Sequence, residues 1–103
     1  MKKKPNFKNI SVLLADSDSC LSQAVVHCLR AMGFSNVTTV TSADDAIKAI
    51  RTRSISLLIT EWTIKNSSGI ELVRYLRYDK TSPNRLLPII MLTGRGELHD
   101  VRV

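Results

Sequence analysis

Four short apolar runs are spaced along the chain, and polar or amphipathic segments separate them. The runs cover residues 10–15 (ISVLLA), 37–41 (VTTVT), 55–60 (ISLLIT) and 88–92 (PIIML). Short runs that are almost continuously apolar or β-branched are typical of strands buried on both faces of a parallel sheet. The pattern therefore predicts four such strands.

The segments between the runs carry helical periodicity. Their apolar positions recur at spacings of three and four, as one face of an amphipathic helix requires. These positions are Leu21, Ala24, Val25, Cys28, Leu29 and Met32 in the first helix, Ala43, Ala46, Ile47 and Ile50 in the second, and Leu72, Val73 and Leu76 in the third. Residues 62–69 are predicted to form a loop, and residues 96–103 to begin a fourth helix. Strands that alternate with helices predict right-handed crossovers and a parallel α/β sheet.

Polar residues with a preference for helix starts stand before each helix. Asp18 precedes the first helix, Ser42 the second, and Ser67 or Ser68 the third. Asp and Ser side chains accept hydrogen bonds from the free N–H groups of a first helical turn. Each of these residues is therefore a candidate N-cap.

Length and charge limit the class of protein. A chain of 103 residues suits one domain, and no apolar run approaches the roughly 20 residues of a membrane span. No signal peptide is recognisable, so we expect a cytoplasmic protein without membrane contact. The net charge is +6, and Lys2, Lys3, Lys4 and Lys8 lie within the first ten residues. We interpret residues 1–8 as a solvated basic tail and residues 9–103 as the domain, with no pattern typical of direct nucleic-acid binding.

The two cysteines, Cys20 and Cys28, fall on the first predicted helix. Eight residues of helix separate them by about 12 Å along the axis, whereas a disulfide needs Cα atoms within about 7 Å. We therefore expect free thiols, packed as small apolar residues.

Residues with candidate chemistry follow three of the four predicted strands. In open parallel sheets, ligands bind outside the carboxyl ends of the strands. The residues at these ends are Asp16, Ser17 and Asp18 after the first strand, Glu61 after the third, and Thr93 and Gly94 after the fourth. Carboxylate and hydroxyl oxygens suit Mg²⁺, which can in turn bind a phosphoryl group. Helix capping is the alternative explanation for the first loop, but it does not account for a carboxylate next to an apolar strand at Glu61.

Three segments resemble bacterial response-regulator receiver domains of the chemotaxis (CheY-like) type. They are VLLADSDS, LLITEWTIKNSSG followed by LVRYLR, and LPIIMLTGRG, and the resemblance extends from about residue 8 to the end. It implies a flavodoxin-like, doubly wound parallel sheet, truncated to about four strands and three to four helices. It also implies a role in two-component signalling rather than catalysis, with a histidine kinase or another signalling protein as partner.

The resemblance assigns roles to individual residues. It implies that an acidic pair after the first strand binds Mg²⁺, and here Asp16 matches the first acid while Ser17 stands at the second. Asp18 lies one place later. Glu61 stands where the family has the aspartate that accepts a phosphoryl group, so Asp16 and Glu61 remain as ligands for weak Mg²⁺ binding. In the fourth segment, the family's phosphoryl-sensing Ser/Thr and the small residue after it correspond to Thr93 and Gly94.

The departures from the family pattern predict an atypical receiver. A glutamate carboxylate reaches about 1.5 Å further than that of aspartate, and phosphoryl transfer depends on position at this scale. We expect Glu61 to supply a fixed negative charge or to be inert, and the domain to act through protein–protein contacts. The family's lysine and fifth strand lie beyond the last residue here, which predicts an incomplete domain with an exposed fourth strand that promotes self-association.

Two alternatives remain open from the sequence. The first is a receiver that a histidine kinase phosphorylates in the ordinary way. The second is a fragment of a haloacid-dehalogenase-type phosphatase, in which Asp16 is the nucleophile and Asp18 the general acid. That interpretation gives Glu61 no role. A nucleotide or flavin site is less favoured, because the first strand-to-helix turn contains no glycine.

Overall fold

A four-stranded parallel sheet forms the centre of the protein. The structure is a computed structural model that describes residues 7–92. The strands of the sheet lie in the order β2-β1-β3-β6, and every neighbouring pair is parallel. Their bounds are β1 (Ser11–Ala15), β2 (Asn36–Val40), β3 (Leu57–Glu61) and β6 (Ile89–Leu92). The predicted flavodoxin-like sheet is thus confirmed, with each strand within two residues of its predicted start.

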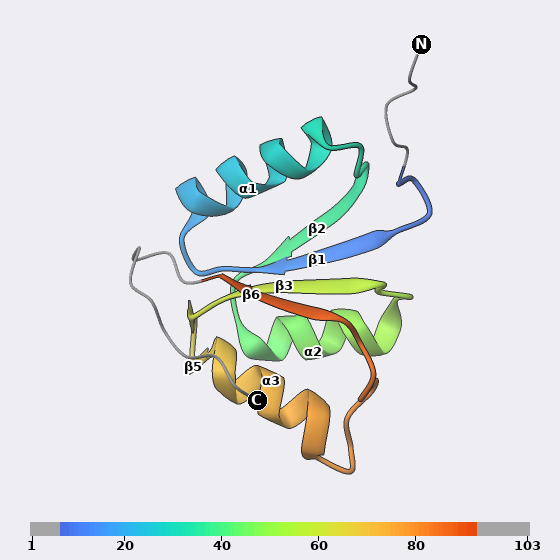
Figure 1. Cartoon of the computed structure of the whole chain (residues 1–103). Coiled ribbons are helices and arrows are strands. Elements are labelled where there is room, and N and C mark those ends of the chain that lie inside the picture. The colour runs from blue at the N-terminus through green and yellow to red at the C-terminus, as the bar shows by residue number, and fades with distance from the viewer. Residues whose placement is uncertain (1–6, 93–103) are drawn as a thin grey trace.

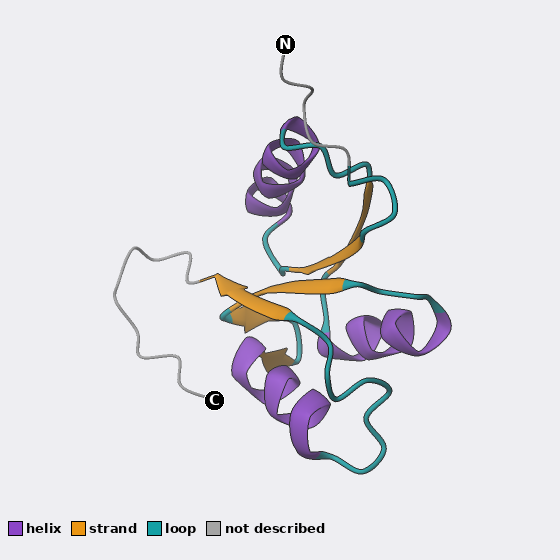
Figure 2. Ribbon diagram, turned by 45° about the vertical axis from the view of Figure 1, so that its right-hand side comes forward, coloured by secondary structure: helices purple, strands orange, loops and turns teal. Residues whose placement is uncertain are grey.

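Three helices cover the two faces of this sheet unequally. The helix α1 (Ser19–Ala31) lies on one face, and α2 (Ala43–Thr52) and α3 (Gly69–Tyr78) lie on the other (Figure 1). Figure 2 shows the same division after the molecule is turned. The predicted fourth helix, at residues 96–103, lies outside the described residues.

Side chains alternate along the strands and divide the core into two layers. Leu13 and Leu58 point to the α2–α3 face and are fully buried there with Leu76. Leu14 and Ile59 point to the α1 face. Because both faces of the central strands are buried, β1 is apolar from Val12 to Ala15 and β3 from Leu57 to Ile59, which is the pattern seen in the sequence.

The three predicted N-caps are confirmed. The Asp18 carboxylate accepts hydrogen bonds from the N–H groups of Cys20 and Leu21, at 2.9 and 3.2 Å. The Ser42 hydroxyl accepts from the N–H of Asp45 at 3.1 Å, and Ser68, rather than Ser67, caps α3 through the N–H of Glu71.

Removing the cap of α2 is expected to weaken the fold measurably. Ser42→Ala leaves the N–H of Asp45 without its acceptor, and losses of this kind cost about 1 kcal/mol. Ser42 is also buried, so water cannot readily replace the hydroxyl. We expect urea denaturation to show this decrease, whereas Ser54→Ala, at an exposed position outside the helix, changes the stability by less than about 0.5 kcal/mol. Equal effects of the two substitutions would contradict the capping role.

The prediction of packed cysteines is wrong, although both thiols are free as expected. Cys20 and Cys28 are exposed on α1, as are Ala24 and Met32 from the predicted apolar stripe. Among the stripe residues, Leu29 is buried and Val25 is half-buried. The physical reason is that α1 lies over part of its sheet face only, so its flank has nothing packed against it within the described residues.

The predicted loop at residues 62–69 contains a small hairpin instead. Strands β4 (Thr63–Ile64) and β5 (Ser67–Ser68) pair antiparallel. Asn66 makes the turn with a φ of 68°, a left-handed conformation that asparagine tolerates better than most residues. Ile64 is buried in the α2–α3 layer of the core, so this hairpin is anchored to the domain.

Candidate functional site

The carboxyl ends of β1 and β3 form an acidic pocket. The two strands are neighbours, and their register pairs Ala15 with Thr60, so the residues after them meet. The pocket has a volume of about 250 Å³. Its lining consists of Asp16, Ser17, Asp18, Leu21, Glu61, Trp62 and Thr63. The structure therefore brings together four of the predicted site residues, while Thr93 and Gly94 lie outside the described residues.

Asp16 is a buried carboxylate at the end of β1, with 3% of its surface exposed. Its Oδ1 accepts a hydrogen bond from the N–H of Asp18 at 2.9 Å, whereas Oδ2 is buried without a hydrogen-bond partner among the described residues. Burial raises the pKa of Asp16. The hydrogen bond from Asp18 acts in the opposite direction, and the negative charge of Asp18 raises the pKa further. The ionised form of the Asp16 carboxylate is therefore destabilised in the folded protein. A bound proton or a positively charged partner would stabilise the group.

Asp16→Asn is expected to stabilise the protein at neutral pH. The pKa of Asp16 in the folded state is raised above its ordinary value of 3.8, so the folded protein binds this proton more tightly than the unfolded chain does. The contribution of Asp16 to the free energy of unfolding therefore falls as the pH rises through the folded pKa. The Asp16→Asn variant has no group that ionises at this position, so its free energy of unfolding does not fall in this way.

Urea denaturation of both proteins at several pH values, with a chelator present, measures the difference. We expect the variant to be the more stable at pH 7 and the difference to disappear below the ordinary pKa. A variant that is less stable at pH 7 would show that the ionised carboxylate has a stabilising partner.

Asp18 and Ser17 make local contacts at the pocket rim. The Asp18 carboxylate caps α1, which is the structural role that the sequence left open. The exposed Ser17 donates a hydrogen bond from Oγ to the carbonyl oxygen of Thr63 at 3.4 Å. This bond connects the loop after β1 with the first strand of the hairpin. A capping carboxylate is less available as the general acid of a phosphatase.

Glu61 is the last residue of β3 and is 7% exposed. Its backbone lies very close to the start of α3, because a Cβ on Gly69 would stand 2.2 Å from the Glu61 carbonyl oxygen. The same oxygen accepts a hydrogen bond from the buried Thr60 hydroxyl at 3.1 Å. Only glycine at position 69 permits this approach.

Hydrogen bonds hold the backbone that follows Glu61. The N–H of Trp62 donates to Leu92 at 3.0 Å, and the carbonyl of Trp62 accepts from Gly69 at 2.7 Å. At the tip of the hairpin, the N–H of Lys65 donates to Thr41 at 2.8 Å. The sequence offered no signal for this network, because strands of two residues carry no recognisable alternation. The segment beside the pocket is therefore tied to β6, α3 and the end of β2.

The pocket lacks a full set of cation ligands. Among residues 7–92 there is no group of three His, Cys, Asp or Glu side chains placed to hold a metal ion. Position 17 carries a serine hydroxyl and no carboxylate, and Asp18 is engaged as a helix cap. The residues present therefore do not fit a strong Mg²⁺ site, although Asp16 and Glu61 could contribute oxygen ligands.

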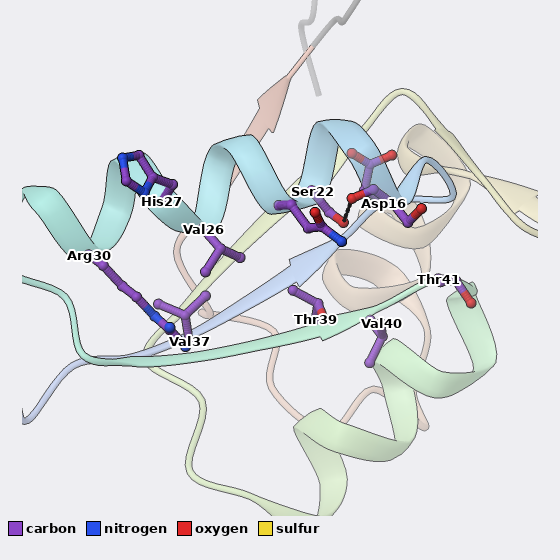
Figure 3. Close-up of a pocket in the computed structure, with 11 residues that line it drawn as sticks. Asp16, Ser22, Val26, His27, Arg30, Val37, Thr39, Val40 and Thr41 are labelled. Carbon is purple, nitrogen blue, oxygen red and sulfur yellow. Dashed lines mark hydrogen bonds between the residues drawn. The ribbon is translucent and has the colours of Figure 1, made fainter.

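A second, larger pocket lies between α1 and the edge strand β2 (Figure 3). Its volume is about 530 Å³, and the lining includes Ser22, Val26 and Arg30 from α1 and Val37 and Thr39 from β2. The sequence did not predict this pocket, which arises from the distance at which α1 crosses an edge strand. His27 also lines it and is exposed.

Comparison with protein families identifies the fold and its class. The model of the response regulator receiver domain matches residues 12–103. The chain therefore belongs to the response regulator receiver domain family, a family of two-component signalling domains. No helix among residues 7–92 has the length and hydropathy needed to span a membrane.

Individual relatives agree with this assignment. Chemotaxis protein CheY-3 of Vibrio cholerae serotype O1 is 24% identical over 94 residues, which are 91% of this chain and 71% of that protein. Phosphate regulon transcriptional regulatory protein PhoB of Rhizobium meliloti is 38% identical over 86 residues, 84% of this chain and 37% of that protein. The chain thus matches only a part of the second relative.

Solved structures show the same fold. Chemotaxis response regulator CheY4 of Vibrio cholerae superposes with a TM-score of 0.72 at 25% identity, covering 85% of this chain and 71% of that one. A response regulator from Chloroflexus aurantiacus gives a TM-score of 0.76 at 25% identity, covering 86% and 70%. The similarity is therefore spread over most of the described residues.

Proposed function

We propose that this chain is an atypical receiver domain that signals through protein–protein contacts without a phosphorylation cycle. The observation that carries the proposal is Glu61, which ends β3 inside the acidic pocket, where the family resemblance expects an aspartate. In this proposal Glu61 supplies a constant negative charge or is inert, and the domain is not an enzyme.

Two features of the site support the proposal. The longer glutamate side chain displaces its carboxylate by about 1.5 Å relative to aspartate, and in-line transfer to a carboxylate tolerates little displacement. Backbone hydrogen bonds of Trp62 and Lys65 also hold the segment that follows Glu61. A backbone shift that compensated for the longer side chain would therefore break several hydrogen bonds. A backbone held in this way favours a single conformation of the site over a switch between two conformations.

Intact-mass spectrometry after incubation with Mg²⁺ and acetyl phosphate tests the proposal. We expect the unmodified protein and the control Glu71→Asp, at an exposed position on α3, to gain no phosphoryl group. A gain by Glu61→Asp alone would show that the longer side chain is what prevents transfer. A phosphoryl group on Glu61 or Asp16 of the unmodified protein would establish a working acceptor and refute the proposal.

Weak Mg²⁺ binding is a separate expected outcome. Trp62, the one tryptophan of the chain, lines the acidic pocket and reports on it by fluorescence. With serine at position 17, we expect the emission to change only at millimolar Mg²⁺ or above. Ser17→Asp adds an oxygen ligand at the pocket and is expected to lower the required concentration at least tenfold. Saturation of the unmodified protein at micromolar Mg²⁺ would contradict this expectation.

The partner that we propose is a histidine kinase or another signalling protein, and the proposed location of both proteins is the cytoplasm. Membership of the receiver family supports this class of partner. Direct nucleic-acid binding is not part of the proposal, and the domain proposed comprises residues 9–103 with residues 1–8 as a basic tail.

Self-association through β6 is a second proposal. Within the described residues, β6 pairs with β3 on one side only, and Ile90 is 49% exposed on it. An apolar edge strand with unpaired backbone groups can pair with another chain. Light scattering is expected to show a mass that rises with concentration, and Ile90→Lys is expected to return the protein to a monomer. A monomer at millimolar concentration would contradict the proposal.

A further inference from the structure

The pocket between α1 and the edge strand β2 combines apolar side chains with neutral hydrogen-bonding groups. Its volume of about 530 Å³ lies within the range of small-molecule sites, which is about 300–1,000 Å³. All of its lining comes from α1, β2 and the residues directly after β1 and β2. Valines form the apolar part, and serine, threonine and glutamine side chains form most of the remainder. Such a mixture is typical of sites that orient a small ligand through a few polar contacts.

Arg30 supplies positive charge at one end of the pocket. Figure 3 shows its side chain running from α1 toward Val37, near the start of β2. Within residues 7–92, no hydrogen bond or ion pair engages the Arg30 guanidinium. A guanidinium presents its N–H donors in a planar fork that matches a phosphate group. His27 lies at the rim, with its ring directed away from β2 (Figure 3). This end of the pocket is therefore suited to an anion.

Asp16 lies at the opposite end of the pocket. Its N–H donates to the carbonyl of Val40 at 3.0 Å, so Asp16 stands beside the last residue of β2. Its buried Oδ2 has no hydrogen-bond partner among the described residues, and a ligand hydroxyl is a donor that would satisfy it. From Val37 to Val40 the strand rises by roughly 10 Å, which sets the distance between the two ends.

Neutral polar side chains lie between the two ends. Gln23 on α1 and Thr39 on β2 line the pocket, and their side chains make no hydrogen bond within residues 7–92. The buried Ser22 donates from Oγ to the carbonyl of Ser19 at 3.1 Å, which leaves its hydroxyl oxygen able to accept. The middle of the pocket therefore offers both donors and acceptors to a ligand that carries several hydroxyl groups.

We propose that this pocket binds a phosphorylated six-carbon sugar, with its phosphate on Arg30 and its far hydroxyl groups at Asp16. Chain bonds of about 1.5 Å, each inclined to the chain axis, give such a phosphate ester a length of roughly 10 Å. The sugar hydroxyls between the two ends match the neutral groups of the lining. A nucleotide fits less well, because none of the described lining side chains is aromatic and able to stack on a base.

Asp16 connects this pocket with the acidic pocket, because its side chain lines both. A ligand that binds Oδ2 changes the surroundings of the pocket that contains Glu61. The ligand thus supplies the domain with an input that needs no phosphoryl transfer. Its binding does not depend on the role proposed for Glu61, so the two proposals can fail separately.

Isothermal titration calorimetry with glucose 6-phosphate, in a phosphate-free buffer, tests the proposal on the full chain. We expect saturable binding with a dissociation constant below about 1 mM. Inorganic phosphate has the anion without the hydroxyl chain, glycerol 3-phosphate is too short to reach Asp16 from Arg30, and sorbitol has hydroxyls without the anion. Each of these compounds is expected to bind at least tenfold more weakly.

Matched variants separate the pocket from general charge effects. Arg30→Gln is expected to weaken binding at least tenfold, whereas Arg74→Gln, which removes the same charge from α3 on the other face of the sheet, is expected to change it less than twofold. Gln23→Trp fills the pocket and is expected to abolish binding, whereas Ala24→Trp, one position later and outside the lining, leaves it unchanged. All four positions are exposed, so the fold is retained.

Four results would overturn the proposal. The first is the absence of saturable binding of glucose 6-phosphate up to about 10 mM. The second is equal affinity for inorganic phosphate, which would reduce the site to an adventitious ion only. The third is equal or tighter binding of 6-aminohexanoate, which would identify a zwitterion as the ligand. The fourth is an equal loss of affinity in Arg30→Gln and Arg74→Gln, which would show that binding depends on net charge rather than on this pocket.

Discussion

Gly69→Ala is expected to lower the free energy of unfolding by about 3 kcal/mol, at the upper end of what overpacking costs. The added methyl group would stand 2.2 Å from the carbonyl oxygen of Glu61 and 3.3 Å from the Thr60 hydroxyl. The first of these neighbours is backbone at the end of β3, which cannot move without disturbing its pairing with β6. Urea denaturation followed by circular dichroism measures the loss.

Gly33→Ala serves as the comparison, because Gly33 is the other glycine among residues 7–92 and has a positive φ. Gly33→Ala, at a φ of 112°, strains the backbone after α1 and is expected to cost about 1 kcal/mol. Position 69 should therefore be the more sensitive of the two. The reverse order would show that the Glu61 carbonyl can move away and that the pocket backbone is softer than the hairpin bonds indicate.

Leu58→Ala is expected to cost about 3 to 4 kcal/mol, because it removes a fully buried side chain from the middle of β3. Leu58 packs in the larger layer of the core between the sheet and α2 and α3. For a domain with a total stability of roughly 5–15 kcal/mol, this loss leaves a marginally folded protein. Thermal denaturation should show a large decrease in Tm.

The same substitution at an exposed leucine is the control. Leu86 is 90% exposed in the segment before β6, so Leu86→Ala is expected to change the stability by less than about 0.5 kcal/mol. Similar losses at the two positions would mean that the core around Leu58 collapses to fill the space, or that the Leu86 segment packs against something in solution.

The fold was predictable because its signals are local and agree with one another. Apolar runs such as ISLLIT are typical of strands buried on both faces of a parallel sheet, and cap residues such as Ser42 mark where helices begin. The acidic pocket was predictable for the same reason. Once β1 and β3 are neighbours, the residues after them, Asp16 and Glu61, lie at the same edge of the sheet.

The parts that were not predictable depend on packing between distant segments. The hairpin at residues 63–68 forms because Ile64 finds a place in the core and Lys65 reaches Thr41, neither of which a local pattern contains. The exposure of Cys28 likewise depends on how much of the sheet α1 covers. A helix with an apolar stripe predicts burial, but the sequence does not say whether a neighbour is present to bury it.

The position of β1 at the centre of the sheet affects how the protein folds while it is being synthesised. This strand leaves the ribosome first, yet Val12 pairs with Leu57, which is made much later. At typical translation speeds, roughly two to nine seconds separate the two residues. During that interval the apolar β1 can pair with β2 alone, and it presents an open edge to chaperones and to neighbouring nascent chains. Slowing translation between residues 40 and 57 would therefore be expected to increase misfolding and to reduce the yield of native protein.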